Sequence, residues 1–137
     1  MDLLKSLAIL LSRICLCSIY LWAGWAKLRN WKGTVTYMQS KNFPYIWLML
    51  PAAILIQILG GLSLLLGFYC RSGTVILIIF TIPAMIKMHN FWKESGDLKL
   101  IEKTFFMKDL ATVGGLIAIL ILGPGTISLD AFLLRHH

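Results

Sequence analysis

The sequence predicts an all-α protein, an antiparallel four-helix transmembrane bundle with short interfacial elements. Hydrophobic residues make up 58% of the 137-residue chain, and the mean hydropathy is +0.80, a balance typical of integral membrane proteins. Four apolar stretches approach or exceed the roughly 18 to 20 residues that cross a bilayer. The four stretches leave too little chain for a second core, so residues 1–137 are expected to form one domain.

The predicted spans cover residues 3–28, 44–69, 73–90 and 105–122. The first could be mistaken for a signal peptide, but Arg13 interrupts its apolar region and residues 23–26 offer no small-x-small cleavage site, so we expect it to be retained. Pro44 and Pro51 fall in the first turns of the second span, where a missing N–H is tolerated. The last two spans are short and call for interfacial anchoring or local thinning of the bilayer.

The connections differ in character. Residues 27–43 mix aromatic and charged side chains, which favours a short helix lying in the membrane interface, and residues 126–134 are similar. Residues 92–104 are the one clearly water-exposed stretch of the sequence. Tryptophans 22, 25 and 31 are typical of an interfacial aromatic belt.

The net charge of +7 is concentrated in two connections. Nine of the thirteen Lys and Arg residues lie there: Lys27, Arg29, Lys32, Lys41, Lys87, Lys93, Lys99, Lys103 and Lys108. The positive-inside rule then predicts an inner-membrane protein with both long connections in the cytoplasm and both termini outside. Because the basic residues flank membrane spans, we expect anionic lipid headgroups as their partners, and no nucleic acid.

Small residues recur at helical spacing in two spans. They are Gly60, Ser63 and Gly67 in the second span, and Ala111, Gly114, Gly115 and Ala118 in the fourth. Such spacing lets transmembrane helices approach closely, so we expect these residues at helix–helix contacts. The three cysteines form no C-x-x-C motif and are interpreted as small apolar fillers.

Arg13 is the most informative residue, because a guanidinium inside a membrane span is costly unless it faces the bundle interior and finds partners. Counting about 1.5 Å per residue from the nearer connection, Arg13 and Gln57 each lie roughly 20 Å deep, so we predict that they are level. Two interpretations remain open. Arg13 and Gln57 line a pocket for an anionic or carbonyl-bearing ligand, such as a quinone headgroup, or their hydrogen bond holds two helices in register.

A second candidate site gathers polar residues from three helix ends: Lys27, Lys87, His89, Trp92 and Asp109. His89 and Trp92 are three apart and would share a helix face, and a histidine beside a carboxylate can shuttle protons. The alternative is that the lysines and Trp92 anchor the interface while Asp109 favours the positive end of a helix dipole. A single internal histidine without a cysteine cluster favours no metal site.

With these residues in place, the chain resembles the DoxX family of small four-helix membrane proteins over nearly its whole length. The resemblance rests on Arg13, on residues 24–28 and 58–62, on Leu66-Gly67, on residues 89–92, and on residues 106–111, 114–115, 123–125 and 128–130. The chain departs from the family pattern at Gln57, where Glu is common, and at Asp109, where Asn is common. Without the Glu, Arg13 lacks a counter-charge on the neighbouring span.

The resemblance implies a membrane subunit of a redox system that interacts with the quinone pool, at most a non-autonomous oxidoreductase subunit with a protein partner or a second copy of itself. A non-catalytic membrane scaffold or assembly factor is the alternative. A small-solute or lipid-binding carrier is a third function, disfavoured because four helices without an inverted repeat are unlike an independent transporter.

Overall fold

The computed structural model describes residues 2–135, and every regular element in that range is helical. Four helices are long and apolar enough to cross a membrane, which confirms the predicted four-helix transmembrane fold. The elements are α1 (Leu3–Arg29), α2 (Trp31–Ser40), α3 (Ile46–Leu66), α4 (Cys70–Met88), the 3-10 turn η1 (Phe91–Lys93), α5 (Gly96–Leu122) and α6 (Leu129–Arg135).

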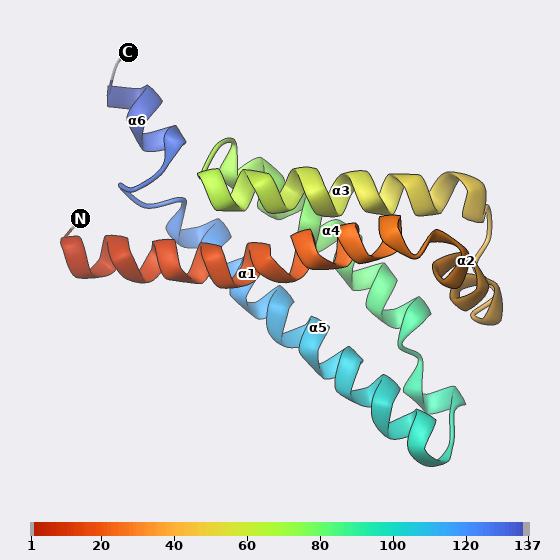
Figure 1. The fold of residues 1–137 in the computed structure, drawn as a ribbon. Helices are drawn as coiled ribbons and strands as arrows, with labels where there is room; N and C mark the ends of the chain where they lie inside the picture. Colours follow the sequence, from red (N-terminus) through yellow and green to blue (C-terminus); the bar gives the residue numbers. More distant parts are fainter. Residues whose placement is uncertain (1, 136–137) are drawn as a thin grey trace.

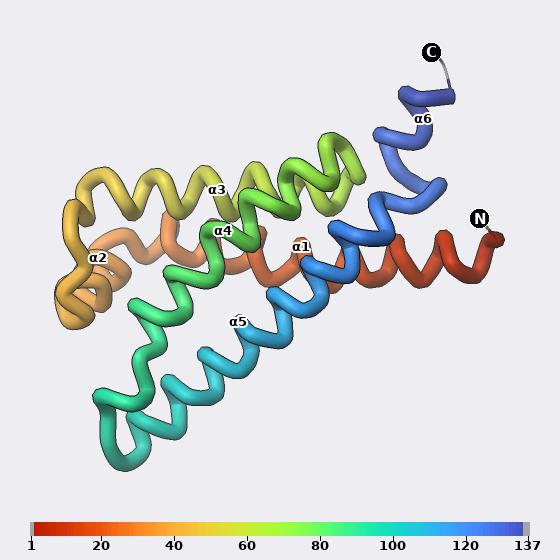
Figure 2. The backbone as a smooth tube through the Cα atoms, turned by 180° about the vertical axis from the view of Figure 1, so that it is seen from behind, coloured from red at the N-terminus to blue at the C-terminus, as the bar shows by residue number. Residues whose placement is uncertain are grey.

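The long helices form two antiparallel pairs arranged as a V. Figure 1 shows α1 beside α3, and α4 beside α5, with the pairs close together near α6 and both termini. They diverge toward α2 and η1, as the view from behind also shows (Figure 2). We call the narrow end the α6 end. The wide end, which carries nearly all the lysines of the two connections, is the basic end.

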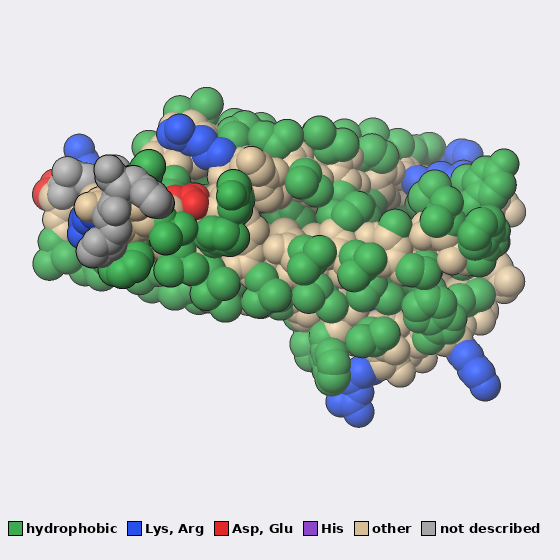
Figure 3. Space-filling model, turned by 90° about the horizontal axis from the view of Figure 1, so that it is seen from above, with side chains coloured by type: hydrophobic (Ala, Val, Ile, Leu, Met, Phe, Trp, Pro, Cys, Tyr) green, Lys and Arg blue, Asp and Glu red, His purple; other side chains and the backbone are tan. Residues whose placement is uncertain are grey.

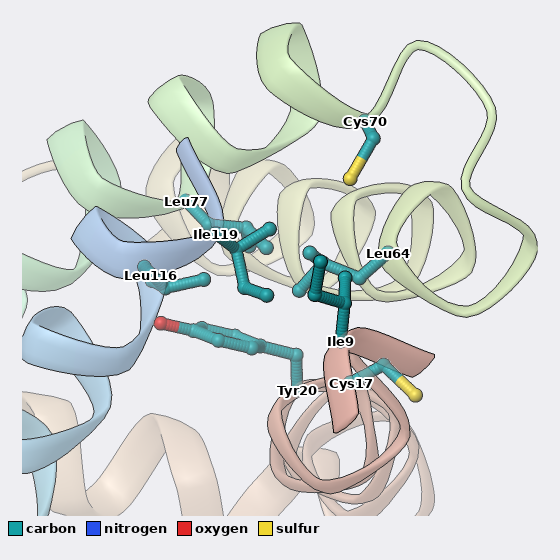
Figure 4. Packing of buried hydrophobic residues seen from close by; sticks show 8 residues of the cluster. All are labelled: Ile9, Cys17, Tyr20, Leu64, Cys70, Leu77, Leu116 and Ile119. Carbon is teal, nitrogen blue, oxygen red and sulfur yellow. The ribbon is translucent and has the colours of Figure 1, made fainter. Parts of the chain in front are cut away.

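The apolar core joins all four long helices toward the α6 end. Tyr20 of α1, Leu64 of α3, Leu77 of α4 and Leu116 of α5 are buried in one cluster (Figure 4). Cys17 and Cys70 are buried in the same cluster as free thiols, which agrees with their expected role as small fillers, whereas the third cysteine is exposed. This packing is the main apolar contact between the two helix pairs, and it lies toward the α6 end.

Short helices are present where interfacial elements were predicted, but one helix boundary is wrong. Residues 31–40 form α2 and residues 129–135 form α6, both short helices between or beyond the spans. The segment expected to be a water-exposed connection up to residue 104 is instead helical from Gly96, so α5 is about 40 Å long at 1.5 Å per residue. Its extension is held by Glu102, a buried carboxylate that reads in the sequence as a surface charge.

The small residues divide into those that pack and those that do not. A Cβ at Gly60 would lie 2.6 Å from the side chain of Leu77, and one at Gly115 would lie 2.9 Å from Leu16, so these glycines permit close helix contacts. The expectation was wrong for Gly114, where a Cβ would meet nothing within 4 Å. Ala111 and Ala118 share that exposed face of α5.

The surface matches a lipid environment. Hydrophobic side chains cover the length of the face seen in Figure 3, and lysines and arginines lie toward its ends and margins. The chain's five tryptophans are all exposed, and all lie on the parts of α1, α2, α3 and η1 nearest the basic end. This distribution extends the predicted aromatic belt, because Trp rings prefer the membrane–water interface.

Candidate ligand-binding cavity

A cavity of about 920 Å³ occupies the space between the diverging helix pairs. This volume is at the upper end of the range typical of small-molecule sites. Most of the wall is apolar and comes from Ile19, Ala23, Met38, Phe43, Pro44, Met49, Leu50, Ala53, Ile79, Phe80, Pro83, Ala84 and Met88. Twelve residues with polar side chains also border the cavity, but apolar surface predominates, as is usual for a site that binds a largely apolar ligand.

Gln57 is the polar group on the α3 wall. Its side chain is only 6% exposed, and its Oε1 has no hydrogen-bond partner among the described residues. The nearby hydroxyls of Tyr20 and Thr81 also line the cavity, but they are 2.6 Å apart and bonded to each other. An unpaired carbonyl in an apolar interior costs free energy, so Gln57 offers a hydrogen-bonding position to a ligand.

His89 lies on the wall between two carboxylates. Its Nδ1 is 2.8 Å from Oε2 of Glu102, and its Nε2 is 3.6 Å from Oδ2 of Asp109. Both ring nitrogens therefore face an acid, which fixes the orientation of the ring and links the cavity to a chain of titratable groups. Lys27 and Lys108 line the cavity near Asp109, with which Lys27 also interacts electrostatically.

Glu102 is the centre of a polar cluster at the basic end. Its side chain is buried, and its Oε1 lies 2.9 Å from the hydroxyl of Tyr37 and 3.6 Å from Nζ of Lys41. Lys41 also donates to Oδ1 of Asn90 at 2.9 Å and pairs with Glu94 at 3.2 Å. Burial, together with the hydrogen bond to Glu102, raises the pKa of the Tyr37 phenol, so this hydroxyl stays protonated.

The predicted pairing of Arg13 with Gln57 is wrong. Arg13 is fully buried, its Nη1 donates to the carbonyl of Leu64 at 3.3 Å, and its Nη2 donates to the carbonyl of Ile127. The Leu64 carbonyl is in the last turn of α3, where the helix leaves acceptors without partners and carries the negative end of its dipole. Arg13 therefore joins α1 to the end of α3 and to the segment before α6, and it does not line the cavity.

The surroundings of Arg13 are built to hold the α6 end together. Gly67 has a φ of +67°, and a side chain there would collide with the guanidinium and with Ser128. Asp130 accepts hydrogen bonds from the backbone N–H groups of Tyr69 at 2.8 Å and Cys70 at 2.9 Å, which caps the start of α4. These contacts make the Arg13 region a structural clip.

The second candidate site is assembled in part. Lys27, Lys87, His89 and Asp109 all line the cavity. Trp92 does not, because α4 ends at Met88 and the chain re-forms as η1, so His89 and Trp92 share no helix face. Trp92 is half exposed and packs edge-on against Phe91 and Phe106.

Sequence reasoning missed Glu102, Lys41 and Tyr37. The first two look like ordinary surface charges of a connection, and nothing in the local pattern distinguishes a buried ion pair from an exposed one. The one available signal was spacing: Tyr37 and Lys41 are four apart, so on a helix they project from the same side. That side is the one that meets Glu102.

The four apolar spans, the aromatic belt at one end and an interior cavity define a small multi-pass helical membrane protein with a pocket between its helices. The DoxX family model matches residues 8–90, more than half of the chain, and the protein belongs to the DoxX family. The model of the SURF4 family also matches, over residues 51–133.

Two curated relatives match along nearly the whole chain. The inner membrane protein YqjF of Escherichia coli (strain K12) is 32% identical over 133 residues, which cover 97% of this chain and 97% of the relative. The inner membrane protein YphA of the same strain is 29% identical over 126 residues, covering 92% of this chain and 90% of the relative. No solved structure matches the chain.

Proposed function

We propose that this protein is the membrane subunit of a redox system and that it binds a quinone in the cavity at its basic end. The carrying observation is the combination of an apolar cavity of about 920 Å³ with Gln57, whose buried Oε1 has no partner among the described residues. A quinone headgroup is apolar at its faces and polar at two opposed oxygens. It therefore fits a site with mostly apolar walls and a few convergent polar groups.

The polar groups suit both redox forms of such a ligand. The Gln57 carboxamide carries an acceptor for a quinol hydroxyl and a donor for a quinone carbonyl. Reduction of a quinone to a quinol takes up two electrons and two protons. A partner protein supplies the electrons, and His89 delivers the protons one at a time, because its ring faces both Glu102 and Asp109.

The charge distribution supports an orientation. Lysines surround the basic end, so we propose that α2, η1 and the start of α5 face the cytoplasm and that both termini face the opposite side. The two Escherichia coli relatives are named inner membrane proteins, which supports the same membrane for this chain. Protons taken up through His89 would then come from the cytoplasmic side.

The test is a titration of the protein, held in lipid nanodiscs, with a short-chain ubiquinone. Binding is monitored by the quenching of the protein's tryptophan fluorescence. Gln57→Leu should weaken binding at least tenfold, because it replaces the hydrogen-bonding amide with an apolar side chain of similar size. Gln39→Leu is the matched control, because Gln39 is exposed on α2 and does not line the cavity. Equal affinity of both variants for the quinone, or no binding by the parent protein, would exclude this function.

The scaffold function has one observation in its favour, the Arg13 clip, which serves the bundle and no ligand. The scaffold function does not explain the cavity. Native mass spectrometry of the gently solubilised protein separates the two: a scaffold carries a protein partner without a small molecule, whereas the proposed redox subunit retains a quinone-sized ligand.

A further inference from the structure

The two helix pairs are joined in different ways at the two ends of the V. At the α6 end the contact is the apolar core of Figure 4. At the basic end, where the pairs diverge, they are bridged by the cluster of Tyr37, Lys41, His89, Asn90, Glu94 and Glu102, which we call the Glu102 clasp. Met88 at the end of α4 also packs on the small apolar cluster around Met38, so the basic end has a minor apolar contact beside the clasp. A large apolar joint at one end and a mainly polar one at the other is an arrangement that can open at the basic end.

One side of the clasp is α2, which belongs structurally to the α1–α3 pair. Met38 of α2 is buried against Leu50 and Ile54 of α3, an apolar contact that keeps α2 on that pair. The chain breaks its helical geometry on both sides of α2, at Asn30 with ψ 56° and at Asn42 with φ 56°. These are the positions where backbone rotation would reorient α2.

The face of α2 that lines the cavity is continuous. Asn30, Gly33, Thr34, Tyr37 and Met38 recur every three or four residues and all border the cavity. The opposite face, with Lys32, Thr36 and Gln39, is exposed. This helix is therefore one wall of the cavity at its basic end, and any movement of α2 relative to α4 and α5 changes the width of the entrance.

The other side of the clasp is Glu102 of α5, whose two oxygens serve different elements. Oε1 faces Tyr37 and Lys41 of the α2 segment, and Oε2 lies 2.8 Å from Nδ1 of His89. The Tyr37 hydroxyl is also 3.1 Å from the carbonyl of Met88, at the end of α4. One buried carboxylate thus holds the two halves together and orients the histidine inside the cavity.

We propose that the Glu102 clasp gates the cavity, and that Glu102 is the positioning residue that couples the orientation of His89 to closure of α2 against α4 and α5. The gate rests on the proposed ligand cavity but does not require that the ligand be a quinone. A ligand that hydrogen-bonds His89 competes with Glu102 for the imidazole ring and so changes the strength with which the clasp holds.

The chemistry of the clasp suits a reversible gate. A buried ion pair gives up hydration when it closes, and its groups regain water when it opens, so the two states differ by less than the gross interaction energy. Opening the apolar core at the α6 end would expose apolar side chains to water, and no hydration of charged groups would offset that cost. Opening is therefore expected as a divergence of the two pairs at the basic end, with the α6 end fixed.

The experiment measures the separation of the halves directly, without ligand. Spin labels are placed at Gln39→Cys on α2 and Lys99→Cys on α5, both exposed positions outside the clasp, in a Cys15→Ser background. Cys17 and Cys70 stay, because they are buried. The distance distribution between the labels is recorded by electron paramagnetic resonance with the protein in nanodiscs.

The parent protein should give one main short distance. Glu102→Ala should shift at least tenfold more of the population to a longer distance, because removing a charged hydrogen-bond acceptor typically changes an equilibrium by about this factor or more. Tyr37→Phe removes a single hydroxyl from the clasp and should give a smaller shift in the same direction. Asp97→Ala, an exposed acid on the same helix, is the control and should match the parent.

Unchanged distances in both clasp variants overturn the gate. If Glu102→Ala fails to fold, Tyr37→Phe decides alone, with Tyr45→Phe at an exposed tyrosine as its control. The gate and the proposed function can fail separately. A distance shift in a protein that binds no quinone supports the gate and rejects the quinone site. Normal quinone binding with unchanged distances in the clasp variants supports the quinone site and rejects the gate.

Discussion

Replacing Arg13 should weaken the fold and leave ligand binding intact. In Arg13→Met an unbranched apolar side chain fills the path of the arginine stem, while the hydrogen bonds to the carbonyls of Leu64 and Ile127 are lost. Removing the guanidinium also recovers its desolvation cost, which is several kcal/mol.

What remains is the cost of two carbonyls left without a donor, about 1 to 3 kcal/mol each when buried. The Leu64 bond is long, at 3.3 Å, which places its carbonyl at the low end of that range. We therefore expect a loss of about 2 to 4 kcal/mol in the free energy of unfolding. Arg29→Met, at an exposed position near the end of the same helix, should change it by less than about 0.5 kcal/mol.

The assay is reversible unfolding in mixed detergent micelles, followed by circular dichroism, combined with the short-chain ubiquinone titration in nanodiscs. Arg13→Met should unfold more easily than Arg29→Met and bind the quinone as the parent does. A tenfold loss of affinity in a folded Arg13→Met protein would show that Arg13 serves the ligand. Stability equal to that of Arg29→Met would refute the clip.

Four further substitutions test the packing by the same unfolding assay. Gly67→Ala should cost more than about 1 kcal/mol, because its φ of +67° and the nearby guanidinium both exclude a side chain; a neutral result would contradict this close approach. Asp130→Ala should cost about 1 to 2 kcal/mol by removing the cap of α4, and no loss would mean that the cap is redundant. Gly114→Ala should gain up to about 1 kcal/mol, whereas Gly115→Ala should gain less or lose stability against Leu16; the reverse order would place Gly114 in the packing.

The fold was predictable because it depends on properties averaged over long stretches of sequence. The length of each apolar stretch and the grouping of lysines between them need no knowledge of individual contacts. The boundary of α5 was not predictable in this way. Glu102 lies in a segment with charges on both sides, and only the distant Tyr37 and Lys41 make its burial favourable.

The sequence singled out only part of the cavity wall: Gln57 and four residues of the second candidate site, Lys27, Lys87, His89 and Asp109, lie on it, whereas Arg13 and Trp92 do not. It also placed Gln57 in the wrong register. Counting residues from the connections assumed that α1 and α3 end at the same level. In the structure α3 begins beyond the end of α1, alongside α2 (Figure 1), so Gln57 is opposite Gly24: a Cβ at Gly24 would lie 3.5 Å from the Cβ of Gln57. This offset separates Gln57 from Arg13 and places them in two different sites, one a cavity and the other a clip.

The most direct test of the cavity as a quinone site is to map where a photoreactive short-chain quinone attaches to the protein in native membranes. We expect crosslinked peptides from the middle of α3 around Gln57 and from the end of α4 around His89, with attachment suppressed by excess unlabelled quinone. Attachment confined to the segments around Arg13 and α6, or attachment that excess quinone does not suppress, would contradict the proposed site.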